Sequence, residues 1–376
     1  MKKIILLSLL LLCFITESQT VREFDDFVIS PTNDFYSNNY LFGSNTGKGN
    51  TGIGSENDFS AALLNPAAFK LNKKFSVFLQ YTHKTNSTVT YNNVYGSNSY
   101  QLIHKPNSFS GGFALKLNKY LICGVLYSNT NNLKYKFDNV ISSSENYSLN
   151  LNIHSFVLPV NLRFGKFGIG VNLFYNLYRD DITGATTIVE PNTPHDITDS
   201  FERFNFQVGL FFKPVNTFSA GLTFTPGFKS DINHSESYSI SPFFKFISTN
   251  PFKVTAGVNF LTLSNKLGIS FDYNFRRTSE ITGYIDKNDI NFGVEYFLNK
   301  NVTLRSGFFT IFDIRDFHNP EVGFPGSEGD FSQYFLTGGF TYKFNNVDIS
   351  LSLMDSHISP EKIKLFQANS TVIFNF

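Results

Sequence analysis

The sequence predicts an all-β fold, namely a transmembrane up-and-down antiparallel β-barrel of about fourteen strands with an N-terminal plug, or hatch, in its lumen. Three observations predict it. The chain begins like an exported protein, its strands alternate apolar and polar residues, and short and long connections alternate along its length. A barrel in a membrane needs these features, because its strands expose every second residue to lipid and its turns differ in length on the two sides.

The first eighteen residues predict a signal peptide. Lys2 and Lys3 form a positive n-region, and residues 4–15 form an apolar stretch that is short for a bilayer-spanning helix. Ser18 offers a small residue for signal peptidase, so we expect residues 1–18 to be removed. The mature chain is therefore expected to begin outside the cytoplasm.

The composition narrows the class of protein further. Phe and Tyr number 45 and 18, Trp is absent, and the formal charge of +1 does not favour a nucleic-acid binder. The mature chain keeps one cysteine, Cys123, so no intrachain disulfide is expected. After the signal peptide no stretch reaches 18 consecutive apolar residues, so no transmembrane helix is predicted. An exported, aromatic-rich chain of this kind fits a barrel in the outer membrane of a Gram-negative bacterium, in contact with its lipid.

The strands are predicted from a hydrophobic period of two. In "LGISFDYNFRR" (267–277), every second residue from Leu267 to Phe275 is apolar, and the opposite face carries Gly, Ser, Asp and Asn between them, followed by Arg276. A helix would need spacings of three and four, which these segments lack. The predicted strands are 75–84, 108–118, 120–130, 151–164, 167–178, 201–213, 217–226, 252–263, 267–277, 288–298, 302–312, 332–344, 346–356 and 363–376.

The connections predict that the sheet closes as an up-and-down barrel. Tight turns at 118–119, 165–166, 214–216, 264–266, 299–300 and 345–346 alternate with longer segments at 85–107, 131–150, 179–200, 227–251, 278–287, 313–331 and 357–362. With short turns on the periplasmic side, an even number of strands puts both termini in the periplasm. A secreted β-sandwich or propeller is the rival fold, and it would not alternate so strictly.

The last strand carries an independent sign of the same fold. "FQANSTVIFNF" ends the chain on Phe376. A final strand that closes on Phe resembles the signal read by the outer-membrane assembly machinery, which we therefore expect as a partner during biogenesis. Residues 75–376 are the predicted barrel domain.

The residues before the barrel, 19–74, are predicted to form the hatch. They contain a literal G-x-G-x-x-G at Gly47, Gly49 and Gly52, but without the strand and helix that give this fingerprint its meaning. These glycines are better explained by tight turning in a confined space. Further on, Asp58 or Ser60 can cap a short apolar helix that the Asn65–Pro66 step ends.

The polar faces of the strands suggest what lines the lumen. They carry Asn, Gln and single charges together with several Phe, and a lumen of this mixture suits an amphipathic ligand. The candidate ligand contacts are Phe174, Phe211, Phe297, Phe309 and Arg305. Alternatively, these Phe lie in the aromatic girdles or pack against the hatch.

Glycines within strands mark candidate bends in the wall. Gly111, Gly112 and Gly124 are candidates for a wall kink, since strand glycines often mark bends or close approach. The simpler alternative is that they are small residues facing the hatch.

Enzymatic and metal chemistry find little support in the sequence. The seven histidines are scattered without a pair at metal-ligand spacing, and the His-x-Ser order at 357–359 has no matching constellation. We therefore expect no enzyme activity, no metal and no cofactor.

The segment "ENDFSAALLNPAAF" (56–69), which follows a glycine-rich run, carries a family resemblance. Its D-x-S-A-x-x-x-N-P-A pattern resembles that of the FadL/TodX-type outer-membrane transport proteins, with matches at Asp58, Ser60, Ala61, Asn65, Pro66 and Ala67. The resemblance implies a fourteen-stranded barrel closed by a hatch, in which Asp58, Ser60, Asn65, Pro66 and Ala67 belong to the gating segment. It implies hydrophobic cargo, such as long-chain fatty acids or aromatic hydrocarbons, that leaves sideways through a gap in the wall.

The function expected from the sequence is passive uptake of hydrophobic small molecules across the outer membrane. Two alternatives stay open. One is a non-transporting barrel that serves as a docking or structural subunit of a protein secretion system, and the other is a small-solute porin. The sequence does not name the ligand.

Overall fold

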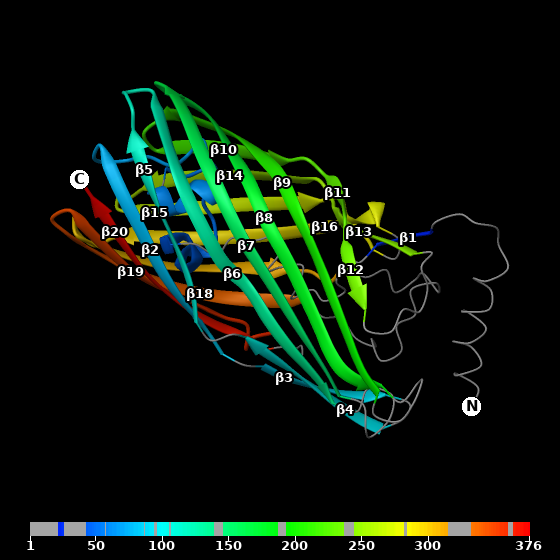
Figure 1. The fold of residues 1–376 in the computed structure, drawn as a ribbon. Helices are drawn as coiled ribbons and strands as arrows, with labels where there is room; N and C mark the ends of the chain where they lie inside the picture. Colours follow the sequence, from blue (N-terminus) through cyan, green and yellow to red (C-terminus); the bar gives the residue numbers. More distant parts are fainter. Residues whose placement is uncertain are drawn as a thin grey trace.

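The computed structural model describes residues 22–25, 43–56, 58–85, 87–93, 96–104, 107–138, 146–186, 193–236, 244–281, 284–314, 332–359 and 364–376. Within them, fourteen strands form a closed antiparallel barrel, in which β20 pairs back onto β2 (Figure 1). These strands are β2 (Phe75–Lys84), β5 (Asn107–Lys116), β6 (Leu121–Asp138), β7 (Asn146–Phe164), β8 (Phe167–Thr186), β9 (Thr193–Val215), β10 (Phe218–Thr225), β14 (Lys253–Thr262), β15 (Leu267–Arg276), β16 (Lys287–Phe297), β17 (Val302–Ile311), β18 (Gln333–Phe344), β19 (Val347–Asp355) and β20 (Phe366–Asn375). Each predicted strand coincides with one of them, so the predicted fold class is confirmed.

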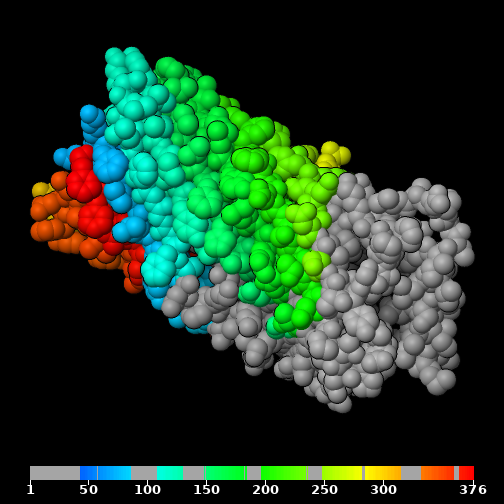
Figure 2. All heavy atoms as spheres, in the orientation of Figure 1, coloured from blue at the N-terminus to red at the C-terminus, as the bar shows by residue number. Residues whose placement is uncertain are grey.

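The alternation of residue types decides which side of the wall each side chain faces. On β15, Phe271 and Tyr273 are exposed on the outer face, while Ser270 and Asp272 are buried toward the lumen. Figure 2 shows the outer face over β6–β9, with neighbouring strands side by side in chain order. The wall thus presents an apolar outer band and a polar inner face, as a barrel in lipid requires. Among the described residues, no helix is long and apolar enough to cross a membrane.

Strands β6 to β9 are much longer than predicted, at 18, 19, 20 and 23 residues. The predicted connections 131–150 and 179–200 are therefore wrong in large part, because strands occupy most of them. Crossing a bilayer needs only about 9–11 tilted residues. The four strands continue past the apolar band as a tall strand extension on one side of the barrel mouth (Figure 1).

The face on which apolar residues lie changes between the membrane band and the strand extension. Within the band of β7, Phe156 and Leu158 are exposed on the outer face. Beyond it, His154 holds an outward position, and Ile153 and Leu151 are buried on the inner face. Because the apolar-out pattern stops at this point, the predicted strand 151–164 begins only a few residues beyond it, whereas β7 begins at Asn146.

Smaller elements decorate the same end of the barrel. The hairpin β3 (Ser87–Asn93) and β4 (Gly96–His104) adds to β6, and β12 (Asn233–Glu236) adds to β9. β1 (Arg22–Asp25), β13 (Phe244–Asn250) and β11 (Phe228–Asp231) form a separate three-stranded sheet. A short 3-10 helix, η3 (Thr278–Glu280), follows β15.

The start of β2 and the end of the chain lie at one end of the barrel, and β1 lies at the other, while the side on which the N-terminus lies stays a prediction. Phe75 and Phe376 meet at the end that carries the short turns, where each backbone N–H donates to the carbonyl of the other. β1, however, pairs with β13 at the end that carries the long connections (Figure 1). The even strand count fixes the two ends of the barrel domain only, since the chain before it runs through the lumen. Residues 1–21, with the predicted signal peptide, lie outside the described residues.

The described part of the hatch, residues 43–56 and 58–74, fills the lumen. It contains two 3-10 helices, η1 (Gly43–Lys48) and η2 (Phe59–Leu63). The Asp58 carboxylate caps η2 by accepting a hydrogen bond from the Ser60 backbone N–H at 2.9 Å. This helix is the predicted short apolar one, and it ends before the Asn65–Pro66 step.

Candidate functional site

A belt of glycines in the wall lets the hatch backbone lie directly against it. A Cβ on Gly257 would lie 2.8 Å from the Ile53 Cβ, and one on Gly209 would lie 2.9 Å from the Pro66 Cδ, closer than real Cβ atoms approach. Eight inward-facing wall glycines lie this close to hatch atoms, namely Gly124, Gly168, Gly170, Gly209, Gly221, Gly257, Gly293 and Gly307, and a Cβ on Gly339 would lie 3.1 Å from the Gly47 Cα. Three pairs of them are cross-strand partners, namely 170–209, 221–257 and 293–307. The wall is therefore recessed where the hatch passes.

On the hatch side, one residue of the fingerprint-like glycine run needs its backbone freedom. Gly49 has a φ of +62°, a conformation that L side chains rarely adopt, and its backbone lies against β16 and β17. The glycine run serves close packing inside the barrel, as the sequence indicated.

Asn65 joins the hatch to the wall through its side-chain amide. This residue is fully buried, and its Nδ2 donates to the Ile53 carbonyl at 2.7 Å and to the Leu210 carbonyl of β9 at 3.0 Å. Its Oδ1 accepts from the Ala67 backbone N–H at 2.9 Å. Pro66 packs on the Gly170 and Gly209 positions of the belt. The amide thus closes the hatch turn and anchors it to the wall at once.

Polar side chains of the wall bond the hatch backbone from several other strands. The Asp272 carboxylate accepts the N–H groups of Gly52 and Ile53, at 2.7 and 3.2 Å. Wall side chains also donate hydrogen bonds to backbone carbonyls of the hatch: Asn172 to Ala62 at 2.9 Å, Asn161 to Phe69 at 2.6 Å, Asn291 to Gly49 at 3.0 Å and Ser219 to Gly54 at 2.6 Å. Buried backbone N–H and C=O groups of the hatch that have no partner in a helix or sheet are hydrogen-bonded in this way.

A cluster of ion pairs fastens the hatch near the short-turn end. Glu56, whose side chain is 17% exposed, pairs with Arg163 of β7, with Lys213 of β9 at 2.7 Å and with Lys70 at 3.6 Å. Burial of Glu56 raises its pKa, but the hydrogen bond from Lys213 and the charges of Lys70 and Arg163 outweigh burial and hold the pKa at about 2. This carboxylate is therefore charged at neutral pH.

The apolar side of η2 forms the main hydrophobic cluster inside the barrel. Phe59, Leu63 and Phe69 pack there against wall residues of β2, β5, β6, β7 and β8. The rings of Phe59 and Phe69 are 5.6 Å apart. A Cβ on Gly124 of β6 would lie 2.7 Å from the Phe59 ring, so this ring presses on the wall at Gly124.

The sheet is interrupted beside this ring. The ladder between β6 and β7 pairs Cys123 with Val160 and next pairs Leu126 with Val157, passing over Gly124 and Val125. The opposing residue of β7 is Pro159, which has no N–H to donate. By contrast, the ladders of β5 run without a break through Gly111 and Gly112. Of the three candidate glycines, only Gly124 lies at an interruption.

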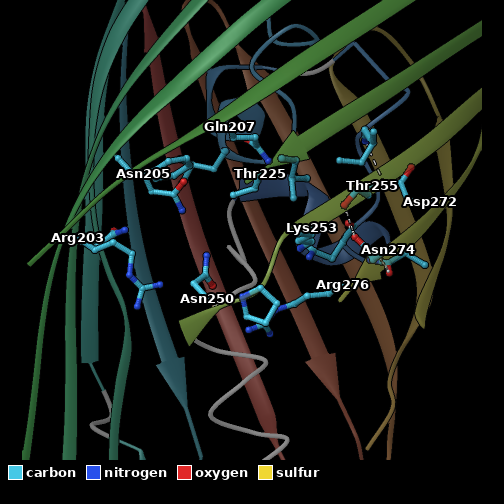
Figure 3. A pocket seen from close by; sticks show the side chains of 18 of the residues that line it. Arg203, Asn205, Gln207, Thr225, Asn250, Lys253, Thr255, Asp272, Asn274 and Arg276 are labelled. Atoms are coloured by element: carbon cyan, nitrogen blue, oxygen red, sulfur yellow. Dashed lines mark hydrogen bonds between the residues drawn. The ribbon is translucent and has the colours of Figure 1, made fainter. Parts of the chain in front are cut away.

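A cavity of about 80 Å³ lies between the hatch and the wall. The hatch contributes Asn50, Ile53, Leu63 and Leu64 to its lining, and the remaining residues come mainly from β8, β9, β10, β14, β15 and β16. Figure 3 shows Arg203 and Asn205 on one side of it and Lys253, Asn274 and Arg276 on another. Its lining is mostly polar.

The predicted lumen contacts are dispersed over the structure. Phe174 lines the cavity, whereas Phe211 packs against Ala67 and Ala68 of the hatch. Phe309 stacks on Phe335 with ring centroids 4.6 Å apart. Phe297 is half-buried near the short-turn end. Arg305 is paired with Glu295 and does not line the cavity. Of the five predicted ligand contacts, Phe174 is therefore the one that lines the cavity.

Sequence reasoning missed the glycine belt, Glu56 and two cationic side chains of the cavity, Arg203 and Lys253. The belt does leave a signal, because each of its glycines lies on the polar face of a strand and precedes an outward apolar residue, as in Gly209–Leu210 or Gly339–Phe340. Glu56 leaves none, since Arg163 and Lys213 lie 107 and 157 residues away along the chain.

Comparisons with known proteins identify the fold. No protein-family model matches the chain, and no curated protein matches its sequence. Among solved structures, a Pseudomonas aeruginosa FadL homologue is similar with a TM-score of 0.65 and 12% identity, over 89% of this chain and 98% of that one. The Pseudomonas putida toluene transporter TodX is similar with a TM-score of 0.63 and 13% identity, over 95% of this chain and 100% of that one.

The Ralstonia pickettii toluene transporter TbuX gives a TM-score of 0.62 and 14% identity, over 88% of this chain and 96% of that one. At these identities the likeness establishes the fold. The protein is a hatch-filled fourteen-stranded barrel with the FadL/TodX-type fold.

Proposed function

We propose that the protein is an outer-membrane channel of the FadL/TodX type that takes up hydrophobic small molecules passively. The observation that carries this proposal is the apolar cluster of Phe59, Leu63 and Phe69 directly inside the interruption between β6 and β7. An apolar molecule in that cluster would be separated from the lipid-facing side of the wall only by a weakened stretch of sheet. The likeness to toluene transporters agrees with this function.

The strand extension is the proposed site of capture. Leu151 and Ile153 are buried on its inner face, and Tyr178 stacks with Phe201 at 4.3 Å between ring centroids. Apolar surface turned away from water offers a dissolved hydrophobic molecule a place to leave the solvent. The short-turn end then faces the periplasm, as in the orientation expected from the sequence.

Passage is proposed to need a local shift of the hatch at Asn65 and Pro66. Only two hydrogen bonds of the Asn65 amide link this turn to Ile53 and to β9. A shift here would withdraw Phe59 from Gly124 and open the interrupted stretch between β6 and β7 as a sideways exit. The concentration gradient supplies the driving force, and no energy source takes part.

A variant that repairs the ladder tests this route. Pro159→Val restores a backbone N–H opposite Gly124, so the exit should close and uptake should fall toward background. Pro214→Val is the matched control, because Pro214 also lies in a wall strand at an irregular register but far along the chain from the Phe59 contact. The assay is uptake of a radiolabelled long-chain fatty acid and of toluene by Gram-negative cells that lack their own channel and express each variant.

Three results would count against the proposal. Uptake by the wild type no faster than by cells without the protein would refute transport, and a simultaneous loss of protein secretion on deletion would favour the docking subunit. Equal uptake by Pro159→Val and wild type would refute the sideways exit. Steady ion conductance of the wild type in planar bilayers would favour a small-solute porin, which a filled lumen disfavours.

A further inference from the structure

Exposed lysines gather at the end of the barrel that carries the short turns. The C-terminus lies at the same end (Figure 1). Five of the short turns carry or adjoin an exposed lysine, and two more lysines precede β2. Outside the ion-pair cluster of Glu56, these lysines, called the rim lysines below, are Lys73, Lys74, Lys119, Lys166, Lys266, Lys300 and Lys343.

Carboxylates do not balance the rim lysines. Within the described residues, the acidic side chains near this end are all partly buried, namely Glu56, Asp58, Glu295 and Asp348. Glu56 and Glu295 are already paired with other cations, so the terminal carboxylate of Phe376 is the exposed acid here. The whole chain carries 31 Lys and Arg against 30 Asp and Glu, so positive charge is segregated to the rim of a nearly neutral protein.

The opposite end of the barrel has no such excess among its described residues. Its exposed cations alternate with carboxylates: Arg179 pairs with Asp181 at 3.0 Å, and Arg277 pairs with Glu280 at 3.4 Å. The two ends therefore differ in charge, and the excess of exposed lysine belongs to the short-turn end.

Exposed aromatic side chains lie beside the rim lysines on the outer face. Three rim lysines are followed directly by such a residue, in the pairs Lys119–Tyr120, Lys166–Phe167 and Lys343–Phe344. The Nζ of Lys119 lies 4.8 Å from the centroid of the Tyr120 ring. Aromatic residues that border the apolar band of a barrel lie at the level of the lipid headgroups. The rim lysines therefore lie at that level as well.

A lysine at the headgroup level has the chemistry to bind a lipid phosphate. Its apolar stem covers apolar surface while its ammonium group stays in the polar layer, where it acts as a point-charge partner for phosphate. Attraction to anionic lipid corresponds to roughly a five-fold gain in affinity for each lysine near the membrane surface.

We propose that the rim lysines bind the phosphates of anionic phospholipids in the membrane leaflet at the short-turn end. Their distribution favours lipid over a protein partner, because the lysines follow the turns around a closed rim, as the surrounding lipid does. A standard protein interface covers only about 800 Å² on one side of each partner. The inference rests on the proposed function only in calling this leaflet the periplasmic one.

Native mass spectrometry of the purified full-length protein, released from detergent, tests the proposal. The probes are phosphatidylglycerol, which is anionic, and phosphatidylcholine, which has no net charge, with identical acyl chains and in equal amounts. We expect the protein to retain phosphatidylglycerol at least about five-fold more than phosphatidylcholine. Pre-incubation at 1 M salt should reduce this preference, because the screening length falls to about 3 Å.

Two variants with equal loss of charge decide where the anionic lipid binds. The rim variant combines Lys119→Gln, Lys166→Gln and Lys266→Gln. The control variant removes three exposed cations at the opposite end and combines Arg179→Gln, Lys229→Gln and Arg277→Gln. The rim variant should lose most of the preference, and the control variant should keep it. Arginine in place of the same three rim lysines keeps the charges and should preserve the preference.

Several results would overturn the proposal. They are equal retention of the two lipids by the wild type, an unchanged preference in the folded rim variant, and the same loss in the control variant. Capture of a polyglutamate peptide through these lysines, without a lipid preference, would assign them to an acidic polypeptide instead. Lipid retention requires no transport, so a wild type that retains phosphatidylglycerol but takes up no cargo would support this proposal and refute only the proposed function.

Discussion

The substitution Glu56→Gln should loosen the hatch at its fastening near the short turns. Glu56 meets Arg163, Lys213 and Lys70, and these partners hold its pKa at about 2 against an ordinary value of 4.5. Each pKa unit corresponds to about 1.36 kcal/mol between the charged and neutral forms, so the ion-pair cluster contributes about 3 kcal/mol at neutral pH. The Glu56 side chain is 17% exposed and that of Lys70 is 47% exposed, so solvent screening reduces this figure to about 2–3 kcal/mol.

The assay is amide hydrogen exchange of the hatch, followed by mass spectrometry on the protein in detergent. If the loss applies to local opening of residues 51–56, their amides should exchange roughly a hundred-fold faster in Glu56→Gln, because about 1.4 kcal/mol is a factor of ten. Amides of the barrel strands should not change. This internal reference distinguishes a loosened hatch from a destabilised barrel.

The stabilisation of the hatch by Glu56 depends on pH and decreases as the pH falls. The pKa of Glu56 is lower with the hatch in place than in a free chain, so its contribution is complete above about pH 4.5. It is lost as the pH falls from about 4.5 to about 2. Wild-type exchange, corrected for intrinsic rates, should approach that of Glu56→Gln across this range, while the variant should stay nearly flat. Equal protection of the two proteins at pH 7 would refute the reasoning.

Three further predictions concern other links between hatch and wall. Asn65→Ala removes three hydrogen bonds of the side-chain amide, each worth about 1 kcal/mol, so exchange of residues 58–68 should speed up about ten-fold or more; unchanged rates would contradict the anchoring role. Gly221→Ala places a Cβ against the Ile53 carbonyl and should lower the melting temperature, as overpacking costs about 1–3 kcal/mol, whereas Gly338→Ala, with open space at that position, should not. Asp272→Asn weakens the acceptor for two hatch N–H groups and should raise exchange at residues 52–53, while a rate equal to wild type would show the carboxylate to be dispensable.

Much of the fold follows from patterns that span only a few residues of the sequence. The period of two in segments such as 267–277 decides which face of the wall meets lipid, because alternate side chains of a strand must point to opposite sides. The alternation of short and long connections decides the up-and-down order. The cap at Asp58 and the stop before Pro66 are also local, since both depend on residues within a few positions of one another. These features could be predicted without knowledge of any distant contact.

The extent of β6–β9 and the path of the N-terminal segment could not be predicted in this way. Above the membrane band the apolar residues change face, so only pairing between neighbours shows that the strands continue. β1 pairs with β13 at the long-connection end, a contact between distant parts of the chain that no local pattern records.

Sequence by itself determined that this protein is an antiparallel β-barrel with an N-terminal hatch, because strand periodicity, turn lengths and the short motifs of the hatch act over a few residues. Tertiary structure alone decided how the hatch is held and where a ligand can lie. Glu56 finds its cations, Asn65 finds the Leu210 carbonyl and Arg203 faces the cavity only after the sheet closes. The reason is geometric: a closed barrel brings side chains from strands far apart in the chain into one lumen, so partners there are set by closure rather than by sequence spacing.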